Sequence, residues 1–83
     1  MKKYELTDAT IEVYGRTLHQ VRYLETGELG GWIETEKNLS QDGNARVFNN
    51  ACVYENAVIF GKARIYEDVQ ISGKAHVFGK ALI

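Results

Sequence analysis

The sequence lacks the disulfides and cysteine-rich metal sites that stabilise many small folds. Its 83 residues contain a single cysteine, Cys52, so no disulfide can form within the chain. A lone cysteine fits a reduced, cytoplasmic compartment and indicates neither a metal site nor a cofactor. Because a chain of this size buries only about 60% of its unfolded surface, we expect one domain with a marginal core.

No charge sign dominates, and no apolar run is long. Ten basic and eleven acidic residues give a formal net charge of −1, which lacks the positive excess typical of nucleic-acid-binding proteins. The opening Met1-Lys2-Lys3 precedes polar residues rather than the apolar core of a signal peptide. No apolar stretch reaches membrane-spanning length. These absences predict a soluble, cytoplasmic protein that binds neither membranes nor nucleic acid.

From Asn44 onward the sequence repeats every six residues. A small residue opens each repeat, and a branched apolar residue follows two positions later. A fixed short period is typical of a solenoid. Counting back in sixes from Ala45 reaches Leu39 and Ile33, so we expect the phase to begin before the strict repeat. The pairs are Ala45/Val47, Ala51/Val53, Ala57/Ile59, Ala63/Ile65, Val69/Ile71, Ala75/Val77 and Ala81/Ile83.

Three extended residues followed by a three-residue corner account for this period. In Ala45-Arg46-Val47 the first and third side chains would point inward and the second outward. The corners are rich in Gly and Asn, which tolerate turn conformations. If three corners complete one circuit, residues eighteen apart stack and their strands pair in parallel. The predicted stacks are Val47 on Ile65, Val53 on Ile71 and Ile59 on Val77.

The first 29 residues follow another pattern. Alternation over 11–13, a turn at 14–16 and an extended stretch over 17–24 predict a β-hairpin, with Gly15 supplying a positive φ. Residues 7–10 are typical of a loop with side-chain-to-backbone hydrogen bonds. We therefore divide the chain into an N-terminal hairpin cap, 1–29, and a β-solenoid of roughly two to three coils, 30–83. Trp32, after two glycines, is predicted to plug the open end of the solenoid.

Two family resemblances rest on these residues. The repeat resembles the hexapeptide-repeat family, which implies an all-β, short left-handed parallel β-helix. It departs from that family where aromatic residues follow the branched position. Over the whole chain, the stretches 3–7, 15–18, 27–34 and 38–40 resemble bacterial and prophage proteins of the YdcK-like type, which implies a genomic setting but no activity. The aromatic residues are Phe48, Tyr54, Phe60, Tyr66 and Phe78.

Three features are candidate sites. His76 is a weak candidate for a general base, since hexapeptide-repeat acyltransferases use a histidine between subunits. The aromatic corner series, interleaved with lysines, fits either a structural ladder or a stacking platform for single strands, and the charge balance favours the ladder. Arg46 and Arg64 occupy equivalent outward positions and could contact a carboxylate or phosphate of a partner.

The hypothesis we favour is an oligomer interface at the C-terminal end. Apolar residues there would be left uncovered, and bare strand edges invite pairing with another chain. The predicted assembly is a homo-oligomer, a dimer in preference to a trimer. The predicted function is a small non-enzymatic binding or assembly protein that engages a protein partner, for example as an inhibitor of a host defence protein. The alternative is an acyltransferase-like enzyme. The interface residues are Val58, Val77, Ala81, Leu82 and Ile83.

Overall fold

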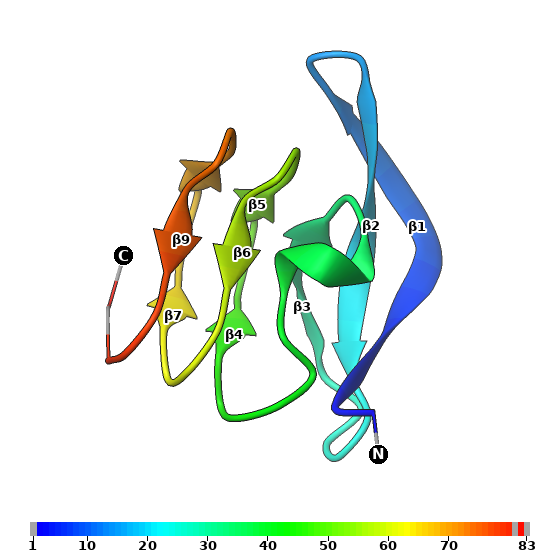
Figure 1. The fold of residues 1–83 in the computed structure, drawn as a ribbon. Helices are drawn as coiled ribbons and strands as arrows, with labels where there is room; N and C mark the ends of the chain where they lie inside the picture. Colours follow the sequence, from blue (N-terminus) through cyan, green and yellow to red (C-terminus); the bar gives the residue numbers. More distant parts are fainter. Residues whose placement is uncertain (1, 81, 83) are drawn as a thin grey trace.

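The structure is a computed structural model that describes residues 2–80 and 82, and it is an all-β protein (Figure 1). Three longer strands precede six strands of two residues each, and a short 3-10 helix, η1 (Glu36–Asn38), lies between the two groups. The strands are β1 (Tyr4–Val13), β2 (Arg16–Tyr23), β3 (Leu29–Ile33), β4 (Arg46–Val47), β5 (Cys52–Val53), β6 (Val58–Ile59), β7 (Arg64–Ile65), β8 (Gln70–Ile71) and β9 (His76–Val77).

The predicted left-handed parallel β-helix is wrong as a fold class. The strands form one five-stranded sheet, in the order β1-β2-β3-β5-β8, and two sheets of two strands, β4-β7 and β6-β9. Among the described residues no sheet closes, and the largest one is mixed and mostly antiparallel. The reason is that β3 pairs antiparallel with β2 and parallel with β5, so the N-terminal hairpin continues the same sheet as the repeats.

The parallel pairing between residues eighteen apart is confirmed in the described repeats. Arg46 pairs with Arg64, Cys52 with Gln70, and Val58 with His76. The earlier partners are twenty apart, because Ile33 pairs with Val53 and Leu39 bridges to Ile59. Ile33 and Leu39 therefore extend the branched columns rather than the small-residue columns, and the bent segment 41–44 accommodates the two additional residues.

Inward-facing positions of the repeat are buried as predicted, most completely near the hairpin. The alanines and branched residues from Ala45 to Ile65 are fully buried. Farther along the chain the burial declines, so that Val69 and Val77 are half-buried and Ala75 is exposed. Tyr4, Tyr23 and Leu39, among others, pack against the same core from the N-terminal side.

Gly30 and Gly31 bring β3 into close contact with the repeats. A Cβ atom at Gly30 would lie 2.6 Å from the Val47 carbonyl oxygen, and one at Gly31 would lie 2.7 Å from the Ala51 carbonyl oxygen. These glycines serve backbone packing instead of a bend that directs Trp32 onto the core. Trp32 lies in a second cluster with Leu18, Cys52 and Tyr54, separate from the main core that it was predicted to plug.

The hairpin prediction is confirmed, although its predicted loop is not. Tyr14 and Gly15 have φ values of 50° and 78°, the left-handed pair required by a tight hairpin turn of type I′. Residues 7–10 lie within β1, where the register with β2 shifts between Leu6 and Thr10. The Thr7 hydroxyl donates to the Gln20 carbonyl at 2.9 Å, a cross-strand bond that holds the irregularity in the sheet.

Every sixth residue of the repeat region has a left-handed backbone. The φ values lie between 57° and 76°, a region that glycine enters without steric cost. A Cβ atom at Gly61 would lie 2.9 Å from the Gly79 backbone nitrogen, whereas one at Gly73 would meet nothing within 4 Å. The residues are Gly43, Asn49, Glu55, Gly61, Glu67, Gly73 and Gly79.

These two glycines allow a matched test of the corners. Gly73→Ala should lower the free energy of unfolding by about 1 kcal/mol, the cost of a side chain in the left-handed region. Gly61→Ala should lower it by about 2 kcal/mol or more, because its Cβ also displaces the Gly79 backbone. Urea unfolding followed by circular dichroism measures both. Equal losses would contradict the stacking of Gly61 on Gly79.

Candidate functional site

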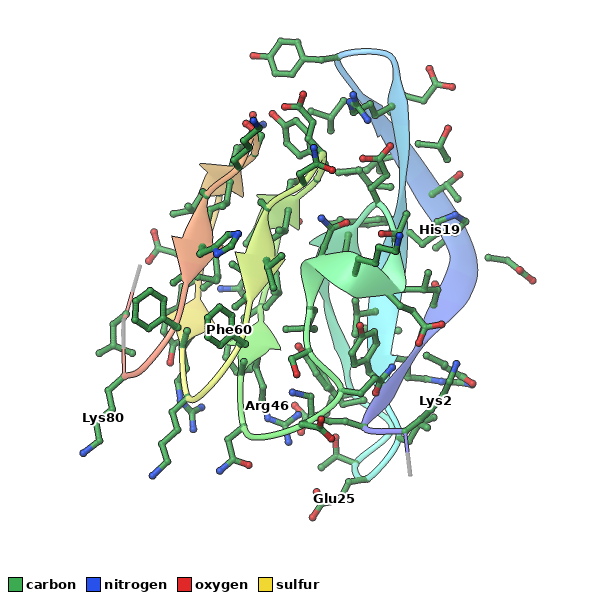
Figure 2. The ribbon with its side chains drawn as sticks, viewed as in Figure 1. Lys2, His19, Glu25, Arg46, Phe60 and Lys80 are labelled. Carbon is green, nitrogen blue, oxygen red and sulfur yellow. The ribbon has the colours of Figure 1, made fainter. Side chains whose placement is uncertain are left out.

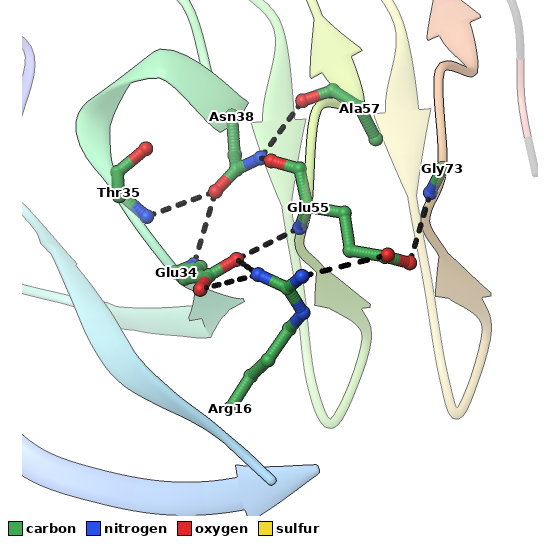
Figure 3. Close-up of polar contacts among 7 residues, drawn as sticks. All are labelled: Arg16, Glu34, Thr35, Asn38, Glu55, Ala57 and Gly73. Carbon is green, nitrogen blue, oxygen red and sulfur yellow. Dashed lines mark hydrogen bonds and ion pairs between the residues drawn. The ribbon is translucent and has the colours of Figure 1, made fainter. Parts of the chain in front are cut away.

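An ionic cluster fastens the hairpin to the repeats. The Arg16 guanidinium, at the start of β2, donates to both carboxylate oxygens of Glu34 at 3.1 and 2.9 Å and lies 3.6 Å from Glu55 (Figure 3). Glu34 in turn accepts from the Glu55 backbone N–H at 2.8 Å, and Glu55 accepts from the Gly73 N–H at 3.2 Å. One guanidinium and two carboxylates thus join β2, β3 and the corners after β5 and β8.

Asn38 completes this attachment from the inside. It is fully buried, and its side-chain oxygen accepts from the backbone N–H groups of Glu34 and Thr35 at 3.1 and 2.9 Å. Its amide donates to the carbonyls of Glu55 and Ala57 at 3.2 and 2.8 Å (Figure 3). A buried amide must be hydrogen-bonded in full to offset its desolvation, and Asn38 meets that condition.

The surface beside this cluster is hollowed but electrostatically paired. The hollow has a volume of about 400 Å³ and is lined by Arg16, Glu34, Lys37 and Glu55, among others. Since its guanidinium and carboxylates already bind one another, they are not free to bind a ligand. We therefore assign this cluster a structural role.

A second charged surface lies on the outer face of β4 and β7. Arg46 and Arg64 are register partners on adjacent parallel strands, as the repeat predicted. The Arg46 guanidinium lies over the Tyr23 ring, with Cζ 4.5 Å from the centroid, a favourable cation–π geometry. The Tyr23 hydroxyl is fixed to the backbone of Val47, since it accepts from the N–H at 2.7 Å and donates to the carbonyl at 3.1 Å. Burial raises the pKa of Tyr23.

Lys3 adds to the positive potential near Arg46. Its ammonium donates to the carbonyls of Ala45 at 2.7 Å and Gly43 at 3.3 Å. Desolvation, and after it repulsion from Arg46, lower the pKa of Lys3 to about 8. Asp42 acts in the opposite direction but does not cancel these effects.

The aromatic corner series is divided between surfaces. Phe48 stacks on Tyr66 with ring centroids 5.0 Å apart, and Phe60 stacks on Phe78 at 5.3 Å, as expected of residues eighteen apart in this repeat. Tyr54 differs, because it is buried in the second cluster and its hydroxyl donates to Gln70 at 3.4 Å. Four of the five aromatic residues therefore form two stacked pairs at the surface, while the fifth ring, Tyr54, is buried.

Apolar side chains of the predicted interface are uncovered around β9. Of the predicted residues, Leu82 is 70% exposed, and Val58 and Val77 are half-buried. Phe78, which was assigned to the aromatic corners instead, is 59% exposed. Leu82 forms an isolated parallel bridge with Arg64, so it continues the outward column of the two arginines. Ala81 and Ile83, which were also predicted to lie in this interface, fall outside the described residues.

His76 has no catalytic surroundings in the described part of the chain. It is exposed, pairs in register with Val58, and meets the Phe60 ring edge-on at 6.4 Å. Within residues 2–80 and 82, no hydrogen bond or ion pair joins it to a carboxylate, and no cluster of three His, Cys, Asp or Glu side chains could hold a metal ion. The lone thiol of Cys52 is buried, and burial raises its pKa.

Sequence reasoning missed the cluster of Arg16, Glu34 and Glu55 entirely. Its partners are eighteen to thirty-nine positions apart and belong to different patterns, so no local spacing connects them. A glutamate at a left-handed corner is not by itself a signal of such a contact, because Glu67 occupies an equivalent corner outside the cluster.

A matched pair of glutamates tests that contact. Glu55 and Glu67 share a left-handed backbone, with φ of 60° and 58°, but only Glu55 belongs to the cluster. Glu67→Gly should raise the free energy of unfolding by about 0.5–1 kcal/mol by relieving backbone strain. Glu55→Gly should give no such gain, because it removes the ion pair with Arg16 and the hydrogen bond from Gly73. Urea midpoints compare them, and an equal gain in both would refute the cluster.

Comparisons with known proteins add no assignment to this geometry. In the part of the chain that the structure describes, no helix has the length and apolar character needed to cross a lipid bilayer. The sequence matches no protein-family model, and it matches no curated protein.

Proposed function

We propose that this protein is a small non-enzymatic binding and assembly protein that pairs with a second copy of itself. The observation that carries the proposal is the exposure of apolar side chains on β6, on β9 and after β9. They are Val58, Val77, Phe78 and Leu82, and we call them the β9 surface. Val77 pairs in register with the fully buried Ile59, yet it is half-exposed itself. Exposed apolar side chains favour association, since each gains by removal from water.

A second copy is the partner that the charges around this surface favour. The corners beside it carry both signs, with Glu67 and Asp68 at one corner and Lys74 at another. A twofold interface brings the same patch of each copy together, so the acidic corner of one copy can lie opposite a lysine of the other. In the same contact, the exposed apolar side chains of each copy would be covered by the other copy.

The proposed setting is bacterial or prophage, on the resemblance to YdcK-like proteins. In that setting the dimer would bind a host protein through the surface that pairing leaves free. We propose that it inhibits a host defence protein. An acyltransferase-like activity is not proposed, because His76 has no orienting carboxylate among the described residues.

Light scattering at micromolar concentration tests the pairing directly. The molar mass measured for the wild-type protein should be that of a dimer of 9.4 kDa chains. Leu82→Asp should shift it to one chain, because a buried carboxylate in the interface is strongly unfavourable. The control is Leu24→Asp, which charges another exposed leucine, 45% exposed, away from the β9 surface, and it should remain paired.

Circular dichroism confirms that each variant is folded before its mass is interpreted. If Leu82→Asp does not fold, Phe78→Asp replaces it, since Phe78 is also largely exposed. A monomeric wild-type protein, or a folded Leu82→Asp protein that still pairs, would overturn the proposal.

A further inference from the structure

The arginines of β4 and β7 have no acidic partner in the described structure. Among residues 2–80 and 82, the ion pairs involve Lys2, Arg16 and Arg22 but neither Arg46 nor Arg64. The two arginines occupy adjacent parallel strands, which lie about 4.8 Å apart. Two like charges so placed repel each other unless an anion lies against them.

Two lysines form a second row beside the arginines. The Lys62 backbone N–H donates to the Gly79 carbonyl at 2.7 Å, so Lys62 lies directly beside Lys80, three repeats further along the chain. Both lysines are exposed. Figure 2 shows the side chains of Arg46 and Lys80 along the same lower edge of the molecule. We call the surface of Arg46, Arg64, Lys62 and Lys80 the basic face.

Apolar and aromatic groups border the basic face. A hollow of about 280 Å³ is lined by Arg46, Arg64, Phe48, Tyr23 and the 59% exposed Leu29, together with Thr26 and Glu28. A ligand that enters this hollow therefore meets two guanidinium groups and an apolar wall. That combination fits a peptide with both carboxylate and apolar side chains.

The aromatic rings disfavour single-stranded nucleic acid as the ligand. Binding of that kind depends on bases that stack on free ring faces. Here Phe48 stacks on Tyr66 at 5.0 Å and Phe60 on Phe78 at 5.3 Å, so the inner faces of the rings are already covered by each other.

We propose that the basic face binds an extended acidic segment of a partner protein. Carboxylates on alternate residues of such a segment, about 6.6 Å apart, contact Arg46 and Arg64. Its apolar side chains lie against Leu29 and Phe48 in the hollow. This inference names a partner chemistry for the proposed binding function and does not depend on self-association through the β9 surface.

A fluorescent peptide of alternating glutamate and leucine is the probe. It should bind the wild-type protein saturably in fluorescence anisotropy, and Arg64→Gln should weaken binding by about tenfold or more. Lys37→Gln is the matched control, since Lys37 is an exposed lysine on η1, which packs against β6 outside the basic face. Its affinity should equal that of the wild-type protein.

Two further probes decide between ligand classes. A peptide of alternating lysine and leucine should not bind, which separates charge recognition from apolar adhesion to the β9 surface. Absence of saturable binding by the acidic peptide, unchanged affinity in Arg64→Gln, or equal or tighter binding of oligothymidylate would each overturn the proposal. If Arg64→Gln does not fold, Lys62→Gln combined with Lys80→Gln takes its place. Peptide binding is measured apart from mass, so its failure is distinguishable from failure of the pairing.

Discussion

The backbone hydrogen bonds between segments about eighteen residues apart are the interaction on which the other features depend. A strand of two residues has no stability of its own, and here each is held by the strand that lies three repeats away in the sequence. The Arg46 N–H donates to the Ala63 carbonyl at 3.0 Å, and the Cys52 N–H donates to the Val69 carbonyl at 2.9 Å. This ladder fixes which side chains face inward, and it also sets the arginines and the aromatic pairs in register. The surfaces proposed to bind partners are therefore products of the same ladder that forms the core.

The hairpin contributes what the repeats lack at their N-terminal side. It supplies β3 as a pairing edge, and the close approach of Gly30 to Val47 leaves no gap between the two parts. Asn38 and the Arg16 cluster then satisfy polar groups that this junction would otherwise bury without partners. Within residues 2–80 and 82, every buried side-chain nitrogen and oxygen has a hydrogen-bond partner. The buried polar groups at the junction are therefore hydrogen-bonded as fully as those inside a domain. For that reason the hairpin and the repeats can share one core.

Much of the repeat region could be predicted because its pattern is local and periodic. The burial of Val47 and Ile65, their pairing, and the Phe48–Tyr66 stack all follow from a period of six. The fold class could not, because nothing in that period shows that the hairpin extends the same sheet in antiparallel fashion. The ion pairs of Arg16 join residues from unrelated patterns, and the arginine–Tyr23 contact depends on a side chain from the hairpin. Sequence periodicity therefore located Arg46 and Arg64 but not the aromatic ring that holds one of them in place.

The left-handed residue at every sixth position has a consequence for how the chain can change length. Insertion of one residue before these repeats would place aromatic side chains such as Phe60 and Phe78 at positions with positive φ and turn the inward-facing alanines outward. Removal of six would preserve the corners but carry each following segment onto the neighbouring sheet, so that Lys62 would leave the side of Arg46. Only a change of eighteen keeps both the corners and the columns. Insertions and deletions in this region should therefore be tolerated only in multiples of eighteen residues.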